Sequence, residues 1–190
     1  MAKRVYFAFH YQDVIDFRAN VVRNHNALTS ADRAGYFDAS IWEESKKKGD
    51  IALKRMINSE LKNTSVTAVL IGSETFARPW VRYEIFKSIE SGNHLLGIHI
   101  NSIKGRDEKT KLKGPNPFDY CGLKISDDGS TGTPIVWKED KWYYFSKLDG
   151  FTIRNQPEKY RGKNLNLSTW LPTYDWVANK GNINFKDWID

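Results

Sequence analysis

Short apolar runs alternate with helix-spaced apolar residues over the first hundred positions of this 190-residue chain. Residues 5–9 form an apolar run rich in β-forming residues, which predicts a strand. Val14, Phe17 and Val21 follow at near-helical spacing and predict a helix. A second strand is expected over residues 36–41. The chain is therefore expected to start with a strand, a helix and another strand.

The same alternation continues to about residue 100. After a charged loop at residues 43–49, Asp50 is placed to cap a helix whose apolar residues recur every fourth position. Residues 65–71 show no polar alternation, which is typical of a central parallel strand covered on both faces. Pro79 is well placed to open a third helix. Residues 95–100 then predict a fourth, mostly apolar strand.

Four strands alternating with three helices predict an α/β fold. We expect a doubly wound, mainly parallel sheet of the flavodoxin-like type, with helices on both faces. Ligands of such sheets bind outside the carboxyl ends of the strands. In this chain those ends lie near residues 9–11, 41–42, 72–73 and 100–101.

The composition changes after residue 102, which indicates a compact domain over residues 1–102 and a C-terminal extension over 103–190. Two β-forming runs flank residues 138–141 and predict a hairpin with a four-residue loop. Residues 171–178 are expected to form a helix. The aromatic residues of the extension are expected to pack it onto the first domain, chiefly Trp170, Trp176 and Trp188.

Several classes of protein fit the composition poorly. No apolar run is long enough to cross a bilayer, and charged residues interrupt the N-terminus, so neither a membrane span nor a signal peptide is expected. A single cysteine, Cys121, excludes an intramolecular disulfide and fits the cytoplasm. The net charge of +6 is compatible with nucleic acid or a small anionic ligand. The lysines gather in segments that are expected to be loops, without a nucleic-acid-binding motif, so no nucleic-acid partner is expected.

Metal and nucleophile motifs are missing from the sequence. It contains no P-loop, no HExxH zinc motif and no GxSxG elbow. His94 and His99 are five residues apart on one expected strand, so they point to opposite faces and cannot share a metal ion. No metal site is expected.

The informative segment is residues 73–84, between the buried strand and the third helix. Trp80 and Glu84 are four positions apart. On a helix this spacing places an aromatic ring and a carboxylate on one face, just beyond the carboxyl edge of the sheet. A ligand pocket at that edge would contain both side chains.

These residues resemble the TIR domain family, in which a serine after the third strand is followed by a Trp-x-x-x-Glu pattern. Ser73, Trp80 and Glu84 match that pattern. Residues 7–13 also resemble the first box of the family, although Ala8 stands where a serine is usual.

More narrowly, four segments are similar to the TIR protein of Thoeris antiphage systems, namely residues 9–13, 37–40, 80–84 and 114–119. This resemblance spans most of the chain, including the extension. The loop over residues 43–50 lacks the Arg-Asp and Pro-Gly elements of animal and plant TIR domains. That difference argues against homotypic receptor signalling and leaves an enzymatic activity open.

The resemblance implies cleavage of NAD, as substrate rather than cofactor, at the bond between nicotinamide and ribose. Nicotinamide in NAD is a cationic leaving group and departs neutral, so the remaining need is to stabilise an oxocarbenium-like ribose. We expect Glu84 to be the catalytic carboxylate that does so. For an arbitrary glutamate, a solvent-facing position on a helix would be the usual alternative.

Other residues near the same edge are candidates for substrate binding. Trp80 either walls the pocket or anchors the core, and Asp38 either holds a ribose hydroxyl or caps a turn. One or two of the side chains that end the first strand are expected to contact the substrate, and the others to lie in the core. The full candidate set is Phe7, Ala8, Phe9, His10, Asp38, Ser73 and Trp80.

The product depends on what captures the ribose cation. Water would yield ADP-ribose, whereas a hydroxyl of the adenosine ribose would yield a cyclic isomer, which a closed, dry pocket favours. The Thoeris resemblance implies a cyclic ADP-ribose signal, made during phage infection, that activates a separate effector protein. It leaves the phage-derived trigger and homo-oligomerisation open. The alternative is a non-catalytic TIR adaptor that works by assembly.

Overall fold

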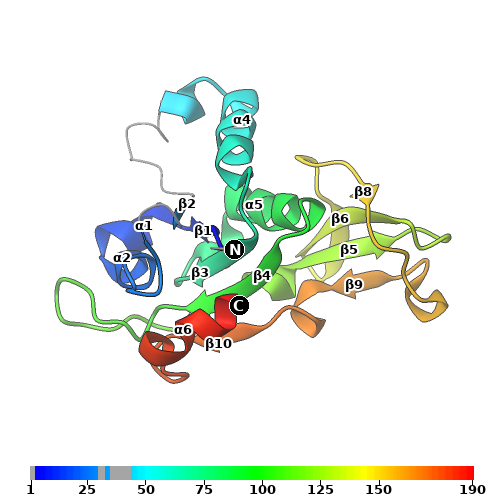
Figure 1. Cartoon of the computed structure of the whole chain (residues 1–190). Coiled ribbons are helices and arrows are strands. Elements are labelled where there is room, and N and C mark those ends of the chain that lie inside the picture. Colours follow the sequence, from blue (N-terminus) through cyan, green and yellow to red (C-terminus); the bar gives the residue numbers. More distant parts are fainter. Residues whose placement is uncertain (1–2, 30–32, 35–43) are drawn as a thin grey trace.

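The computed structural model describes residues 3–29, 33–34 and 44–190. Its first sheet has five strands, all paired in parallel, in the order β10-β4-β3-β1-β2. The strands are β1 (Val5–Phe9), β2 (Arg33–Ala34), β3 (Val66–Ile71), β4 (His94–His99) and β10 (Thr173–Asp175). The expected parallel α/β sheet is confirmed (Figure 1).

Helices cover both faces of this sheet. Alternate residues of β1 and β3 point to opposite sides, so each strand contributes to two hydrophobic clusters. One cluster contains side chains of α4 (Asp50–Leu61) and α5 (Pro79–Glu90). The other contains side chains of α2 (Arg18–Arg23) and α6 (Gly181–Ile189). The sheet is therefore buried on both faces, which explains the unbroken apolar run of β3.

The N-terminal part differs from expectation in three details. The helix expected around residues 14–21 is two helices, because Phe17 adopts a left-handed conformation (φ 68°) between α1 (Tyr11–Ile15) and α2. Residues 44–47, expected to be loop, form a short helical turn. Gly49 occupies the N-cap position of α4, and Asp50 is the first helical residue instead. The strand expected over residues 36–41 lies outside the described residues.

A second, antiparallel sheet lies beside the first, against α5 (Figure 1). Its strand order is β7-β6-β5-β9, and β8 pairs with β6. The strands are β5 (Cys121–Ile125), β6 (Thr131–Lys138), β7 (Lys141–Tyr144), β8 (Phe151–Thr152) and β9 (Asn164–Asn166). Phe145, just after β7, packs against Phe86 of α5 with ring centroids 5.2 Å apart. One face of this sheet thus shares the hydrophobic cluster of α4 and α5.

The hairpin is present, but the expected four-residue loop is wrong. Lys138 pairs with Lys141, so only Glu139 and Asp140 form the turn. Both have positive φ, 51° and 56°, as a type I′ turn requires. Neither residue is a glycine or asparagine, so the usual sequence signal for this turn is missing.

The helix expected over residues 171–178 is also wrong. Residues 173–175 form β10, which pairs in parallel with β4, and the helix of this region is α6. The backbone amide of Gly97 in β4 donates to Pro172 O at 2.9 Å. The outer edge of β4 needs such partners, and this tertiary requirement outweighs the local apolar pattern.

The extension therefore contributes a strand to the first sheet and also forms the second, antiparallel sheet. β10 and α6 both follow residue 102, and Trp176, Phe185 and Trp188 lie in the same cluster as β1 and β3. Trp170 instead remains 49% exposed. Lys3 and Asp190 form an ion pair at 3.6 Å, so the described ends of the chain meet (Figure 1). The division at residue 102 stays a prediction.

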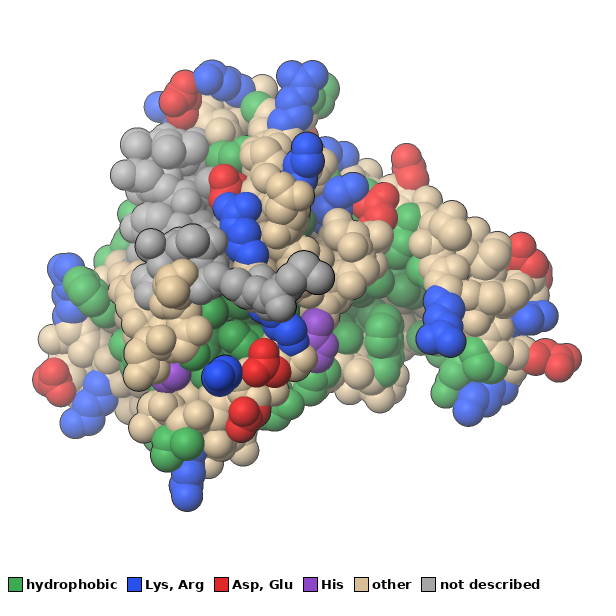
Figure 2. Space-filling view, in the orientation of Figure 1, with side chains coloured by type: hydrophobic (Ala, Val, Ile, Leu, Met, Phe, Trp, Pro, Cys, Tyr) green, Lys and Arg blue, Asp and Glu red, His purple; other side chains and the backbone are tan. Residues whose placement is uncertain are grey.

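Charged side chains are spread over the surface. On the face shown in Figure 2, Lys and Arg alternate with Asp, Glu and uncharged side chains and do not gather into one patch. None of the helices in the described residues is long and apolar enough to span a membrane.

Candidate active site

Glu84 lies in the second turn of α5 and faces the sheet. Its side chain is buried, with 4% of the residue exposed. The phenol of Tyr6 donates a hydrogen bond to Glu84 Oε1 at 2.6 Å, and Tyr6 is itself fully buried. Tyr6 points to this side because alternate β1 residues face α4 and α5. Strand β1 thus supplies a direct partner for the expected catalytic carboxylate.

Burial dominates the electrostatics of Glu84. Desolvation raises the pKa of Glu84 to about 8, and the hydrogen bond from Tyr6 lowers it in part. The pKa of Tyr6 is raised well above its usual value, first by burial and then by the charge of Glu84. No Lys or Arg of the described residues forms an ion pair with Glu84. Near neutral pH the carboxyl group is therefore largely protonated.

A chain of buried polar side chains fixes this part of α5 against the sheet. Ser88 Oγ donates to Glu84 O at 2.7 Å, and Thr67 Oγ1 of β3 donates to Ser88 Oγ at 2.8 Å. Asn93 Nδ2 donates in turn to Thr67 Oγ1 at 3.1 Å. The Thr67–Ser88 bond ties α5 to β3, whereas the side chain of Glu84 is held toward β1 by Tyr6.

Trp80 makes the contacts of a packing residue. Its ring meets the ring of Tyr83 edge to face, with centroids 5.6 Å apart. From the extension, Lys147 Nζ lies 4.5 Å from the Trp80 ring centroid and also pairs with Asp50. Trp80 thus joins α5 to the extension, as the core-anchor alternative requires.

The strand residues divide between the two faces of the sheet. Ala8 is fully buried on the same face as Tyr6 and Glu84. Phe7 is buried on the opposite face, where its ring centroid lies 6.5 Å from that of Phe185. Phe9 packs on that second face too, under the guanidinium of Arg23. The structure therefore does not bring Phe7 and Phe9 together with Glu84.

His10 and Ser73 lie at the carboxyl edge, after β1 and β3. His10 is half-buried, and its pKa is lowered first by burial and then by the charge of Arg78 at the start of α5. Ser73 is exposed. His10 therefore lies within electrostatic reach of Arg78, the N-cap residue of the helix that carries Glu84.

Asp13 is a buried acid at this edge that sequence reasoning did not single out as a site residue. It is 3% exposed, and burial raises its pKa to about 6 against the lowering charges of Lys111 and Arg18. A Cβ at Gly72 would overlap the Asp13 carboxylate, so glycine is needed there. The only sequence signal was the acidic residue in the first box of the TIR resemblance.

The basic segment after β4 lies over the same edge. Lys111 forms an ion pair with Asp16, and its backbone amide donates to Asn101 O at 2.9 Å. Gly114 packs so closely on Gly72 O that it leaves no room for a Cβ. Contacts with Asp16 and Asn101 thus hold Lys111 of this basic segment in place.

Asp38, another candidate for substrate binding, lies outside the described residues. Within the described ranges, no group of three or more His, Cys, Asp or Glu side chains could hold a metal ion.

A family described as "Thoeris protein ThsB, TIR-like domain" matches residues 6–104, just over half of the chain. The chain belongs to the ThsB TIR-like family. This confirms the TIR and Thoeris resemblances. The ThsB match covers β3, β4, α5 and all of β1 except Val5, and therefore includes both Tyr6 and Glu84.

A comparison with curated proteins extends the ThsB relationship to the whole chain. The sequence is 54% identical over 192 aligned positions to a protein of Bacillus cereus (strain MSX-D12) named "Putative cyclic ADP-D-ribose synthase ThsB1". The alignment covers 100% of both chains. The antiparallel sheet and β10 are thus encoded in a region that this ThsB relative shares.

Proposed function

We propose that this chain is an enzyme that cleaves NAD at the nicotinamide–ribose bond and closes the remaining ADP-ribose into a cyclic isomer. The observation that carries the proposal is the buried Glu84 carboxyl held by Tyr6. It sits in a ThsB TIR-like domain whose curated relative is named as a cyclic ADP-D-ribose synthase.

Glu84 would act on the charge that develops at the ribose. When the bond to nicotinamide breaks, its electron pair goes to the nicotinamide nitrogen, which becomes neutral, and positive charge develops on the ribose carbon and ring oxygen. A carboxylate close to that charge stabilises the transition state. Its effect is large where water is excluded, because the local dielectric is low.

The protonation state of Glu84 links this chemistry to substrate binding. With a pKa of about 8, most of the carboxyl is neutral at pH 7 before substrate arrives. The cationic nicotinamide ring of NAD would favour the ionised form, so binding would release a proton to solvent. Tyr6 acts here as a positioning residue, since its phenol donates to Glu84 Oε1 and favours the carboxylate.

Cyclisation requires that a hydroxyl of the distant ribose reach the cationic carbon before water does. The attacking oxygen forms the new bond to that carbon, and its proton passes to the Glu84 carboxylate. The low exposure of Glu84 supports this route, because a dry site slows hydrolysis and favours an internal nucleophile. Ala8, His10, Ser73 and the undescribed Asp38 are the substrate contacts we propose at or near this site, whereas Phe7, Phe9 and Trp80 are assigned to packing.

We further propose that the cyclic product is a diffusible signal in the cytoplasm of a phage-infected cell. It would activate a partner effector protein, as the Thoeris family membership suggests. A phage-derived trigger and self-association would then control when the enzyme works.

The test is mass spectrometry of small molecules from phage-infected cells that express wild-type protein, Glu84→Gln or Glu90→Gln. Glu90 is a matched control, because it lies on the same helix and is exposed. We expect an ADP-ribose isomer with wild type and Glu90→Gln, and at least a roughly hundredfold loss with Glu84→Gln.

Two other outcomes would change the assignment. Linear ADP-ribose as the only Glu84-dependent product would indicate a hydrolase. Equal product levels in wild type and Glu84→Gln, with phage protection kept in both, would refute catalysis by Glu84 and support the adaptor alternative.

A further inference from the structure

One face of the antiparallel sheet points away from the hydrophobic cluster that contains α4 and α5. Cys121, Leu123 and Ile125 of β5 point into the hydrophobic cluster, so Gly122 and Lys124 point the opposite way. The pairing registers place on this second face Gly122, Lys124, Thr133, Ile135, Trp137, Trp142, Tyr144, Asn164 and Asn166. We call it the open face.

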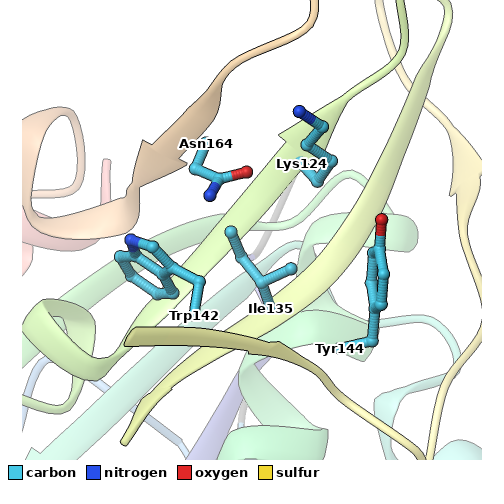
Figure 3. Close-up of a pocket in the computed structure, with 5 residues that line it drawn as sticks. All are labelled: Lys124, Ile135, Trp142, Tyr144 and Asn164. Atoms are coloured by element: carbon cyan, nitrogen blue, oxygen red, sulfur yellow. The ribbon is translucent and has the colours of Figure 1, made fainter. Parts of the chain in front are cut away.

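A pocket on the open face has an apolar floor and mixed walls. Ile135 lies at its base, Trp142 and Tyr144 of β7 stand on one side, and Lys124 and Asn164 on the other (Figure 3). Its volume is about 210 Å³. Pockets that enclose drug-sized ligands measure roughly 300–1,000 Å³, so this one has room for a single ring system.

Trp142 is held in position by its neighbours. Its ring packs edge to face on Trp137, with centroids 5.2 Å apart. It also lies so close to Gly122 that a Cβ there would come within 3.1 Å of the ring. Tyr144, two residues along the same strand, projects on the same side and is 70% exposed. Because strands rise about 3.3 Å per residue, the two aromatic side chains leave the backbone roughly 6.6 Å apart. This separation is close to twice the contact distance between stacked rings, so a flat ring fits between them.

The polar groups around this floor are available to a ligand. Among the described residues, none hydrogen-bonds to the indole N–H of Trp142, the hydroxyl of Tyr144 or the side-chain amide of Asn164. Lys124 donates to Gly162 O, and no carboxylate of the described chain pairs with it. The site therefore offers two aromatic surfaces, donors and acceptors for the edge of a ring, and one uncompensated positive charge.

We propose that this pocket binds a nucleotide, with the base stacked against Trp142 and Tyr144 and the phosphate next to Lys124. A base presents a flat π surface and a hydrogen-bonding edge, and aromatic residues on an open sheet bind it by stacking. The site is separate from Glu84, because the open face points away from the cluster that contains α5. The proposal does not depend on the NAD-cleaving activity.

The same chemistry occurs in free nucleotides and in single-stranded nucleic acid. The small volume favours a free nucleotide, since one base fills the pocket. Titrations with AMP and with a four-nucleotide single-stranded DNA distinguish the sources. A strand that binds at least roughly tenfold tighter than AMP, and loses affinity steeply with salt, would identify nucleic acid as the source.

The experiment follows the indole N–H signals of the seven tryptophans by NMR while AMP, adenosine or ribose 5-phosphate is added. A Trp142→Phe variant assigns the signal of Trp142. We expect AMP to shift this signal saturably, adenosine to do so more weakly, and ribose 5-phosphate to have no effect. Lys124→Gln should remove the difference between AMP and adenosine.

Two neighbouring tyrosines provide a matched pair of variants. Tyr144→Ala should weaken AMP binding roughly fivefold or more, the range for loss of one stacking partner. Tyr143→Ala should change it less than about twofold, because Tyr143 points to the other side of β7. Absence of any saturable shift at Trp142, or equal weakening by both variants, would overturn the proposal.

Discussion

Replacement of Glu84 by glutamine should flatten the dependence of the protein's stability on pH. The pKa of Glu84 is about 8 in the folded protein, against an ordinary value of 4.5. Below pH 4.5 both the folded and the unfolded chain keep the proton, so burial of this group carries no ionisation cost. Between pH 4.5 and 8 the unfolded chain releases the proton while the folded chain retains it, so the free energy of unfolding falls as pH rises. Above pH 8 Glu84 is ionised in both states, so it lowers the free energy of unfolding no further.

The size of the effect follows from the pKa difference. One pKa unit corresponds to about 1.4 kcal/mol, so the shift allows a loss of up to roughly 5 kcal/mol across this interval. Glutamine has nearly the same shape, accepts a hydrogen bond from Tyr6 and does not ionise. The Glu84→Gln variant should therefore escape the loss and become more stable than wild type near pH 8.

Urea unfolding of both proteins at about pH 5 and pH 8 measures this directly. At pH 5 the carboxyl is neutral in the folded state, so the difference between the proteins there reports mainly shape and hydrogen bonding. Its change between pH 5 and pH 8 reports ionisation alone, because Asp13 and the histidines titrate equally in both. Parallel pH profiles for the two proteins would refute the view that Glu84 is buried in its neutral form.

Three further predictions concern other parts of the structure. Tyr6→Phe should move the pH profile of NAD turnover to higher pH, because loss of the hydrogen bond raises the pKa of Glu84 further; an unshifted profile would exclude Tyr6 as its positioning partner. Asp140→Gly should stabilise the hairpin by roughly 0.5–1 kcal/mol, seen as a higher Tm, since the turn requires positive φ at this residue. Phe185→Ala should lower the free energy of unfolding, measured in urea, by roughly 3–5 kcal/mol. Ile183→Ala on the same helix should lower it little, because Ile183 is 68% exposed, and equal effects would contradict the packing of α6 on the first sheet.

Part of the candidate site could be read directly from the sequence. The Trp80–Glu84 spacing and Pro79 placed the carboxyl on the third helix, and the TIR resemblance implied that it acts in NAD cleavage. Tyr6 could not be found in this way, because it lies 78 residues from Glu84 and reads as one more apolar strand residue. Asp13 was equally hidden, since its carboxylate occupies the space that a Cβ at Gly72, far away in the chain, would fill.

The sequence by itself determined the elements whose signals are local. The apolar run of β3, the proline that opens α5 and the alternation of strands and helices depend on neighbours a few residues away. Only the tertiary structure decided that residues 173–175 become a strand and that Glu84 is held as a buried acid. Both outcomes arise from groups far apart in the chain. The edge of β4 needs hydrogen-bond partners, and the helices and strands packed around Glu84 exclude water from its carboxyl group.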